Sequence, residues 1–492
     1  MKQSLHARMR RKHFRLLITF TWVLLLVVLF TRDLFIPDIS NREIILLEKA
    51  RQERYYGVWF ERKRIGYVAE VLQPVDQGYI LDQEARILLN VLETTQPIDM
   101  RVKARLSDGL LLKDFDFTFR SPFYNMSAEG YVEGNKVTFK LDTGRSTINE
   151  SVTLSGPPLL AVNDRSYLLK QLKSAGQKIK IPSFDPVSLN GRESIVTYHG
   201  QEKLLVRRRL KVLHKFSEIT GGMRINFWLD NEGRIVKEES PAGFQFIAEP
   251  EFRAKDIVST GNELLRAVAI PVVGPLPGEN AETVSYRLSY PGDLELDIPG
   301  GRQTLNDDIL TISLEQVPPT ADSPFPASCP GPEFLQPSRY VQSDNEEIRR
   351  LAGSIVGDET DQALQVRLLA SWIYRNIEKR PVLGLPDALT TLHGKQGDCN
   401  EHASLFAALA RSLGINAAIA TGVTLQDDAF YYHAWNEVCL DGQWYSLDTT
   451  TNQLPADLYH IRFGLGDMDE QLKIGGLLGK LKIEIRNPSR GM

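Results

Sequence analysis

The first hydrophobic pattern in the chain is an uninterrupted apolar run near its start. Residues 16–31 contain no charged side chain, and sixteen helical residues reach about 24 Å against a bilayer core of about 30 Å. Residues 1–15 hold six basic side chains and no acidic one. The pattern predicts that residues 1–40 form a basic tail and a transmembrane anchor. A cleaved signal peptide is the alternative, but no small-x-small cleavage site follows the run.

The position of the basic residues predicts the topology of this anchor. Positive charge on one side of a membrane helix marks the cytoplasmic side. We therefore expect a single-pass protein of the cell inner membrane, with a cytoplasmic N-terminus and a periplasmic or otherwise extracytoplasmic body.

From about residue 41 to 255 the pattern changes to short alternating runs. Tyr55–Phe60, Arg101–Leu106, Phe115–Phe119 and Lys136–Leu141 are examples, and turn signals such as Asp108-Gly109 separate them. This spacing predicts a large antiparallel β-rich domain, curved or closed, interrupted by a helical patch near 167–175. The basic run at 207–209 is expected within a strand, on its solvated face.

Residues 256–337 read as a small β-unit followed by a linker. The segments SYRLSY and LTISLEQV predict strands, and seven prolines then fall between Pro318 and Pro337. Proline fixes φ and lacks a donor, so this stretch is expected to be an extended connector.

The last part of the chain, residues 338–492, changes to helical spacing. Apolar residues recur every three or four positions in 345–356 and 361–377, with Asp344 and Asp361 as expected N-caps. The predicted class is α+β, with this domain behind the β-rich one.

Composition and charge narrow the function. Lysine plus arginine total 58 and aspartate plus glutamate total 62, so the net charge is −4; without the six basic residues of the tail, the remainder is 52 minus 62, or −10. An acidic body argues against nucleic acid as a partner. Three cysteines exclude a disulfide scaffold.

The position of Cys399 suits a nucleophilic thiol. In GDCNEHASLFAALARSLG the apolar residues Leu405, Phe406, Leu409 and Leu413 predict a helix that begins near Asp398 and ends before Gly414. Cys399 then lies in the first helical turn. The positive end of the helix dipole favours thiolate there, so the thiol pKa is expected below its free value.

A predicted hairpin supplies a base. The strands YYHAWNEVCL and QWYSLDTT join at Asp441-Gly442, a strong two-residue turn signal that pairs Leu440 with Gln443. In that register His433 and Asp448 share one face on a diagonal, within reach of an imidazole–carboxylate hydrogen bond. Glu437 shares the face but is too far along the strand to orient His433.

Together these residues predict a Cys399–His433–Asp448 triad. Cys399 would attack an acyl carbonyl, His433 would carry the proton, and Asp448 would hold the imidazole. The backbone N–H of Cys399 is an oxyanion donor, and His393 and Gln396 are alternatives for a second one.

Other roles for these residue types are less favoured. The sequence has no CxxC or HxxxH, so no metal is expected, and no cofactor motif is present. A Cys399–Cys439 disulfide is disfavoured by strand length. His402 is expected to pack or hydrogen-bond on its own helix.

These residues resemble a known family. GDC at 397–399, HAWNEV at 433–438 and WYSLDTT at 444–450 resemble the transglutaminase-like core of the papain-like thiol enzymes, over residues 387–450. The segment from Leu335 and the β-region at 55–70 are similar to membrane-anchored bacterial members. The resemblance implies a helix-plus-antiparallel-sheet core with Cys399 as nucleophile, His433 as base and Asp448 as orienter. It implies a protein or peptide amide substrate, and no calcium loop accompanies it.

Two functions follow from the sequence. The first is anchored, thiol-dependent acyl transfer or amide hydrolysis of the transglutaminase, deamidase or peptidase type, through a thioester. The second is a non-catalytic envelope binding or assembly protein that uses the β-rich domain and keeps the core as a scaffold.

Overall fold

The chain divides into residues 1–51 and a second unit, residues 52–492, which holds every described helix and strand. The computed structural model describes residues 51–486 except 61, 92–93, 123, 145–146, 161–164, 208, 221–222, 258–268, 279, 293, 295, 317–330, 381–386, 427 and 468–473. None of the helices in these ranges is both long and apolar enough to cross a membrane. The anchor predicted at residues 16–31 lies outside the described residues.

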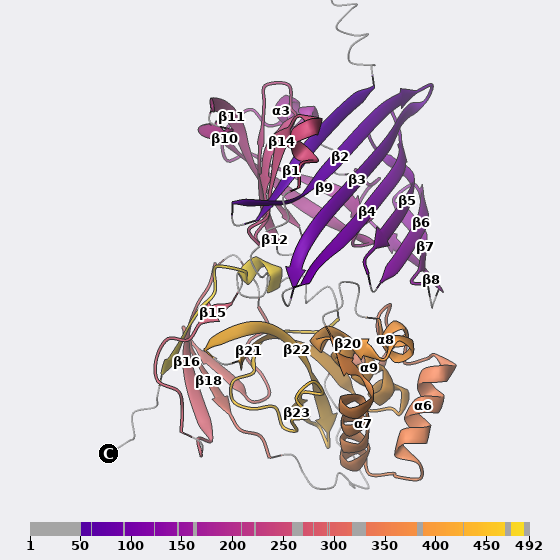
Figure 1. The fold of residues 1–492 in the computed structure, drawn as a ribbon, viewed down its shortest axis with the longest axis vertical. Helices are drawn as coiled ribbons and strands as arrows, with labels where there is room; N and C mark the ends of the chain where they lie inside the picture. The colour runs from indigo at the N-terminus through magenta and orange to yellow at the C-terminus, as the bar shows by residue number, and fades with distance from the viewer. Residues whose placement is uncertain are drawn as a thin grey trace, which may run out of the picture. The chain divides into compact units, whose positions relative to one another are not determined.

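The N-terminal half of the second unit is one fourteen-stranded antiparallel sheet (Figure 1). Its order is β8-β7-β6-β5-β4-β3-β2-β1-β14-β13-β12-β11-β10-β9. The strands are β1 (Gln52–Phe60), β2 (Lys63–Val75), β3 (Gly78–Val91), β4 (Thr94–Leu106), β5 (Leu112–Arg120), β6 (Asn125–Glu133), β7 (Lys136–Asp142), β8 (Thr147–Thr153), β9 (Lys178–Asp185), β10 (Asn190–Val206), β11 (Arg209–Thr220), β12 (Met223–Leu229), β13 (Ile235–Glu239) and β14 (Gln245–Glu249).

The large sheet curves until its two ends share a core. Phe184 of β9 contacts Phe115 of β5 and Phe139 of β7, with ring centroids 5.2 and 6.1 Å apart. Strand alternation alone explains this, because one face of each strand is apolar and must be covered. The helix α3 (Ser166–Gln171) packs Leu168 into a second cluster with Phe216 and Phe227. The predicted curved antiparallel sheet is confirmed.

The basic run corrects one expectation about this sheet. β10 ends at Val206 and β11 begins at Arg209, so Arg207 lies in the turn of a hairpin and Arg209 begins a strand. Arg207 has a φ of 52°, in the left-handed region that tight turns require.

The C-terminal half combines two smaller sheets with a group of helices. The first sheet orders β15 (Ile270–Pro271), β22 (Ala429–Leu440), β21 (Ala417–Gln426) and β24 (Ile461–Leu465), and β23 (Gln443–Leu447) pairs with β22. The helices are α6 (Glu346–Val356), α7 (Gln362–Asn376), α8 (Ala388–Gly394) and α9 (Cys399–Ser412). Short elements complete it: η2 (Pro332–Leu335), η3 (Gly475–Leu477), and the parallel pair β19 (Glu378–Lys379) and β20 (Gln396–Gly397). The short helix α4 (Glu251–Ala254) follows β14 and packs on β1 and β2 of the large sheet.

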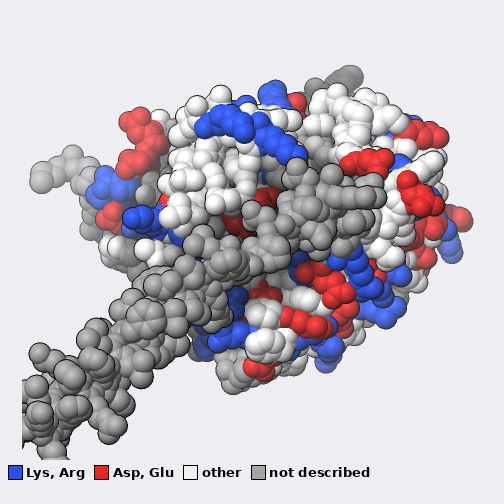
Figure 2. Space-filling model, turned by 90° about the horizontal axis from the view of Figure 1, so that it is seen from above, with Lys and Arg blue, Asp and Glu red and all other residues white. Residues whose placement is uncertain are grey.

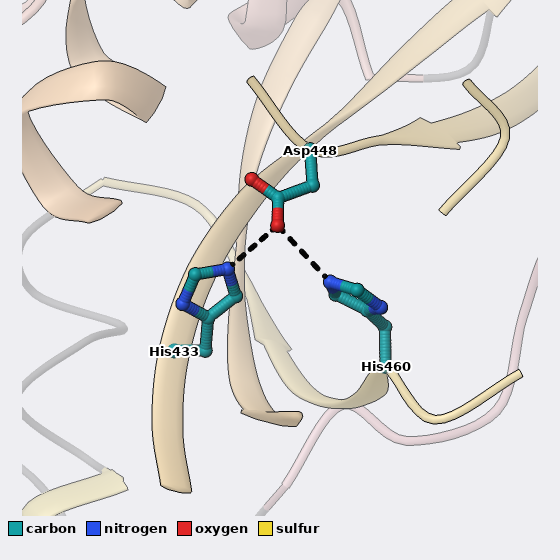
Figure 3. A group of neighbouring side chains, drawn as sticks. All are labelled: His433, Asp448 and His460. Atoms are coloured by element: carbon teal, nitrogen blue, oxygen red, sulfur yellow. Dashed lines mark hydrogen bonds and ion pairs between the residues drawn. The ribbon is translucent and has the colours of Figure 1, made fainter. Parts of the chain in front are cut away.

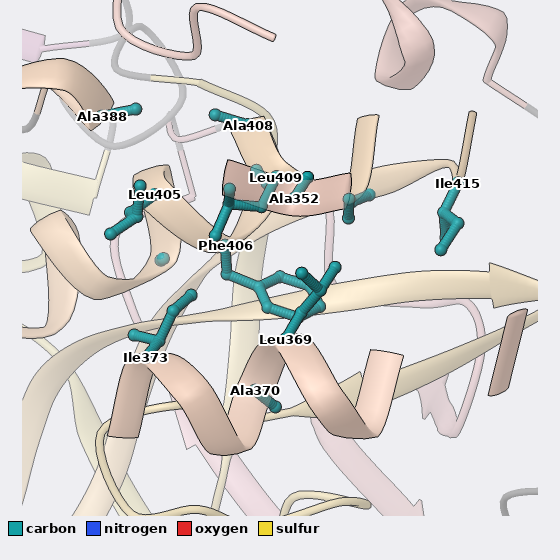
Figure 4. Close-up of a cluster of buried hydrophobic side chains, with 14 of the residues drawn as sticks. Ala352, Leu369, Ala370, Ile373, Ala388, Leu405, Phe406, Ala408, Leu409 and Ile415 are labelled. Atoms are coloured by element: carbon teal, nitrogen blue, oxygen red, sulfur yellow. The ribbon is translucent and has the colours of Figure 1, made fainter. Parts of the chain in front are cut away.

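The helices bury α9 at the centre of this half. Leu405, Phe406 and Leu409 of α9 pack against Leu369 and Ile373 of α7, as Figure 4 shows. Asp361 caps α7 as expected, but Asn345, and not Asp344, caps α6, because the Asn345 side chain accepts the N–H of Glu347. The predicted position of α9 is confirmed.

The second small sheet orders β17 (Gln303–Asn306), β18 (Ile309–Ser313), β16 (Thr283–Ser289) and β25 (Lys482–Arg486). Strands from before the proline-rich segment therefore pair with a strand from the end of the described chain. Tyr286 of β16 also contacts Phe430 of β22. This sheet thus shares a core with the sheet that carries the hairpin.

A buried ion pair joins β24 to β22. Arg462 donates to Glu437 at 2.7 Å, and both side chains are less than a tenth exposed. Burial raises the pKa of Glu437, against the attraction of Arg462. Glu437 is thus occupied in the core, in agreement with its exclusion as the orienter of His433.

Replacing Arg462 with Met should destabilise the protein by about 3–5 kcal/mol, because Glu437 would remain buried without its cation. The loss should shrink at low pH, where Glu437 can be protonated. Arg101→Met is the matched control: it removes a half-exposed ion pair with Asp82 and should cost less than about 1 kcal/mol. Denaturant unfolding of both variants measures the difference, and equal losses would contradict the assignment.

Candidate active site

Cys399 is the first residue of α9, in the position that the sequence predicts. Asp398 caps the helix: its side chain accepts the N–H of Asn400, and its own N–H donates to the carboxylate of Glu401 at 2.9 Å. This capping box does not use the N–H of Cys399. That N–H points out of the helix start, where no intrahelical acceptor exists.

Gly397 makes room for this cap. A Cβ on Gly397 would lie 2.3 Å from the Cβ of Glu401. Only glycine fits beside a glutamate that folds back over the helix start. The glycine of the GDC motif therefore serves the cap that positions Cys399.

The hairpin of β22 and β23 places His433 and Asp448 together. Leu440 pairs with Gln443 and Asn436 with Leu447, so the register predicted from Asp441-Gly442 is confirmed. His433 Nε2 lies 2.9 Å from Asp448 Oδ2, and the two side chains are 7% and 1% exposed (Figure 3). An ionised carboxylate only accepts, so Nε2 carries the proton and Nδ1 is the basic atom of the neutral ring.

Asp448 is held by more than His433. The N–H and the hydroxyl of Thr450 donate to its Oδ1 at 2.7 and 2.6 Å, and the hydroxyl of Thr451 donates to Oδ2 at 2.8 Å. Burial would raise the pKa of Asp448, but the bonds from His433 and His460 outweigh burial and hold that pKa well below its usual range. The carboxylate is therefore ionised and fixed in direction.

The thiol of Cys399 lies close to the strand that carries His433. The N–H of Ala434, next to His433 in β22, hydrogen-bonds the sulfur of Cys399, and Asp448 is close enough to affect the thiol's titration. The structure thus joins His433 to Asp448 and places Cys399 at the start of a helix that packs against β22.

The expected low thiol pKa is wrong. Burial raises the pKa of Cys399 well above its ordinary value, and the nearby carboxylates of Asp398, Glu401 and Asp448 add to the effect. The hydrogen bond from the N–H of Ala434 lowers the pKa of Cys399 but is a smaller cause than burial. Desolvation of the anion is the largest effect because the sulfur is enclosed by protein.

His460 is a member of the cluster that the sequence did not reveal. It lies just before β24, its Nε2 is 3.3 Å from Asp448 Oδ2, and its Nδ1 is 2.8 Å from Asp457 Oδ1. Both nitrogens face carboxylates that only accept, an arrangement that stabilises the protonated ring. Burial lowers the pKa of His460, but the two carboxylates together raise it. His460 is the only histidine after His433 in the sequence, which was the one available signal.

The segment that carries His460 is anchored from the other small sheet. Arg302 donates to the backbone oxygens of Asp457 at 2.7 Å and His460 at 2.9 Å. Gly422, which pairs with His433, allows β24 to approach, because a Cβ there would lie 1.9 Å from the oxygen of Ile461. The position of His460 therefore depends on residues far apart in the sequence.

The remaining candidates have other partners. His393 is bonded to Glu347 at 2.8 Å, which takes it out of use as an oxyanion donor. His402 donates from Nδ1 to the backbone oxygen of Asp398, the cap of its own helix, at 2.7 Å, as expected. Gln396 lies in β20 and is half-buried. No contact of its side chain with Cys399 is seen in the part of the chain that the structure describes.

The described cysteines have different states. Cys399 is free, and Cys439 is disulfide-bonded. The disfavoured Cys399–Cys439 disulfide is therefore absent between these two described residues. Cys329 is the third cysteine of the sequence and lies outside the described residues.

His433, Asp448 and His460 could also hold a metal ion, since one ligand atom from each lies within 4.8 Å of the others. The hydrogen bonds among them already account for their positions. A metal would also occupy Nε2 of His433 and so break its bond to Asp448. The arrangement can orient the His433 imidazole through its bond to Asp448, and it places a thiol at the start of a helix that packs against the strand of His433.

The sequence around this cluster matches a known family. The family model of the Transglutaminase-like superfamily matches residues 349–449, a range that includes Cys399, His433 and Asp448. The chain therefore contains a transglutaminase-like domain, and with it the core of a thiol-dependent class of transferases and hydrolases. His460 lies beyond the matched range.

Solved structures give more distant likenesses. A candidate cysteine protease from Cytophaga hutchinsonii is 18% identical over 45% of this chain and 85% of its own, with a TM-score of 0.26. A beta-barrel-like protein from Brucella abortus is 12% identical over 41% and 95%, with a TM-score of 0.31. Both scores are below 0.5, so these likenesses carry no argument about fold or function. No curated protein matches the sequence.

The raised pKa of Cys399 sets the expected reactivity of the thiol. Iodoacetamide should modify Cys399 slowly at neutral pH and faster above pH of about 9, past the free-thiol pKa of about 8.5. Asp398→Asn keeps a capping side chain but removes a nearby charge, so its rate near pH 8 should rise about two- to fivefold. Asp361→Asn, at the cap of α7, is the control. Mass spectrometry of the Cys399 peptide measures the rates, and fast, pH-independent labelling at pH 7 would contradict this.

The charge on His460 predicts how its contribution to stability depends on pH. A histidine whose folded pKa is raised stabilises fully below its unfolded pKa of about 6.5, and this stabilisation is lost as pH rises through the folded pKa. His460→Gln should therefore cost about 1–3 kcal/mol near pH 6 and less near pH 9.

The control for this variant is His199→Gln, since burial lowers the pKa of His199. Thermal unfolding of wild type and both variants across this pH range makes the measurement. A His460→Gln penalty that grows with pH would show that the ring is neutral in the folded protein.

Proposed function

We propose that this protein is a membrane-anchored thiol enzyme that transfers or hydrolyses amide acyl groups through a Cys399–His433–Asp448 triad. One observation carries the proposal: the thiol at the start of α9 lies beside β22, where His433 Nε2 is hydrogen-bonded to Asp448. Asp448 is ionised and accepts further hydrogen bonds. Such an arrangement leaves Nδ1 as the base for the thiol.

The thiol is the neutral form at rest, because burial raises its pKa. We therefore expect general-base chemistry and not a preformed ion pair. As the Cys399 sulfur attacks the amide carbonyl carbon, its proton passes to His433 Nδ1. Asp448 stabilises the imidazolium, and the backbone N–H of Cys399 is directed at the oxygen that gains negative charge.

The intermediate then breaks down to a thioester. The C–N bond breaks, and the leaving amine takes the proton from His433. Water or a second amine, deprotonated by His433, attacks the thioester and frees the thiol. Water gives deamidation or proteolysis, and an amine gives cross-linking.

The substrate class follows from the proposed topology. We propose that residues 16–31 anchor the chain in the inner membrane and that the body lies outside the cytoplasm, where protein or peptide amides of the envelope would be available. The disulfide at Cys439 supports a position of the body outside the cytoplasm, because disulfides persist in oxidising compartments.

Thioester formation on Cys399 tests the proposal. The full chain in detergent is incubated with a peptide mixture rich in glutamine, and hydroxylamine is added to capture the acyl group as a hydroxamate. Cys399→Ala should abolish both the acyl adduct seen by intact mass and the hydroxamate. Asp448→Asn should lower the rate about a thousandfold or more, since the imidazole loses its orientation.

His214→Gln is the control, because His214 lies in β11 of the large sheet and should leave the rate unchanged. A hydroxamate yield that survives Cys399→Ala would contradict the proposed nucleophile. The absence of any adduct, with the fold intact, would favour the alternative of a binding or assembly protein that keeps the core as a scaffold.

A further inference from the structure

The hairpin of β10 and β11 leaves the large sheet at its tip. β10 pairs with β9 only as far as Thr197, and β11 pairs with β12 only as far as His214. Beyond these points the two strands pair with each other alone, up to Val206 and Arg209. Their inner face packs Val206 and Leu213 on Trp228 and Val236.

The outer face of this hairpin tip is apolar and uncovered. Leu205 and Leu210 form a cross-strand pair and are 68% and 67% exposed, and Val212 beside them is 51% exposed. Apolar side chains on a strand normally face the core, but this leucine pair faces solvent.

Basic side chains surround this apolar face. Residues 203–212 read KLLVRRRLKV, which contains five basic residues and no acidic one. Lys203, Arg207, Arg209 and Lys211 are exposed. The preceding Glu202 is paired with Lys215. The hairpin therefore combines positive charge with exposed leucines, although the body as a whole is acidic.

Neighbouring acidic side chains do not cancel this charge. In the turn between β12 and β13, Asp230 and Glu232 are both paired with Arg234. Glu251 of α4 is paired with Lys255 at 2.8 Å. Figure 2, which views the molecule from above, shows Lys and Arg side chains beside an uncharged area, with Asp and Glu side chains also on the face it views.

The hairpin lies at the end of the sheet where the chain enters it. Arg207 reaches the backbone oxygen of Ala248 in β14, and Ala248 pairs with Tyr56, four residues after β1 begins at Gln52. Figure 1 shows β10, β11 and the start of β1 at the same end of the sheet. Phe252, 79% exposed, follows directly after β14 at this end.

We infer that this hairpin is a membrane-contact element that binds the anionic surface of the bilayer. Its arginines and lysines fit lipid phosphates, and Leu205, Leu210 and Val212 fit the boundary between headgroups and acyl chains. The apolar run at 16–31 precedes Gln52 in the sequence. The inference rests on the proposed anchor for its setting, but not on the proposed catalytic activity.

Trypsin cleavage of the full chain in lipid nanodiscs tests this. Lys203, Arg207, Arg209 and Lys211 are all trypsin sites. Cleavage there should be about tenfold or more slower in discs with phosphatidylglycerol than in discs of phosphatidylcholine alone. Raising salt from about 0.1 to 0.5 M should remove much of the protection, because the Debye length shortens.

The turn between β1 and β2 is the internal control. Arg62 is also basic and exposed, but it lies at the opposite end of β1. Its cleavage should be equal in both kinds of disc. Leu205→Ser with Leu210→Ser, and separately Arg207→Glu with Arg209→Glu, should each remove the protection at the hairpin while the Arg62 site reports an unchanged fold.

Three results would overturn the inference. Equal cleavage of the hairpin in both discs would exclude binding to anionic lipid. Equal protection in both discs would show that the hairpin makes a contact that does not depend on the charge of the lipid. Protection in detergent without lipid would show that another part of this chain covers it.

Discussion

One buried carboxylate organises the site. Asp448 accepts hydrogen bonds from His433, His460, Thr450 and Thr451. A charge removed from water is tolerated only where donors replace the lost solvation, and here the donors come from β22, from the turn at Thr450 and Thr451, and from the loop before β24. The positions of the hairpin, the loop before β24 and the base His433 are therefore set by the same ionised group.

Burial raises the pKa of the Cys399 thiol, whereas the hydrogen bonds to Asp448 lower the pKa of that carboxyl group. Donors surround Asp448, whereas the sulfur has the N–H of Ala434 and three carboxylates near it. The same helix start that offers a favourable dipole also buries the sulfur, and burial is the larger effect. A base is then needed at the moment of attack, which gives His433 a different role from that of a partner in a resting ion pair.

The sequence predicted those parts of the site that local rules determine. The Asp441-Gly442 turn determined the register of β22 and β23, and that register placed His433 beside Asp448. The apolar spacing of α9 placed Cys399 at its start. The large antiparallel sheet followed from alternation, although its strand order could not be read from it.

What the sequence could not predict depends on contacts between distant segments. His460 reaches Asp448 only because Arg302 and Gly422 position its loop. The pKa of Cys399 depends on how much protein encloses the sulfur, which no spacing rule gives. The turn at Arg207 was hidden because arginine lacks the usual turn chemistry of glycine or asparagine.

The sheet formed by β17, β18, β16 and β25 has a consequence for the order in which the protein can be assembled. Arg302, which holds the loop of His460, precedes the proline-rich segment, whereas β25 comes from near the end of the described chain. The segment 338–450 alone would contain Cys399, His433 and Asp448. It would lack Arg302 and the strands β16, β17, β18 and β25. A nascent chain emerging in order from the ribosome would therefore hold the thiol, the imidazole and the carboxylate before β25 exists to complete the sheet, and the finished site would form only after β25 has been synthesised.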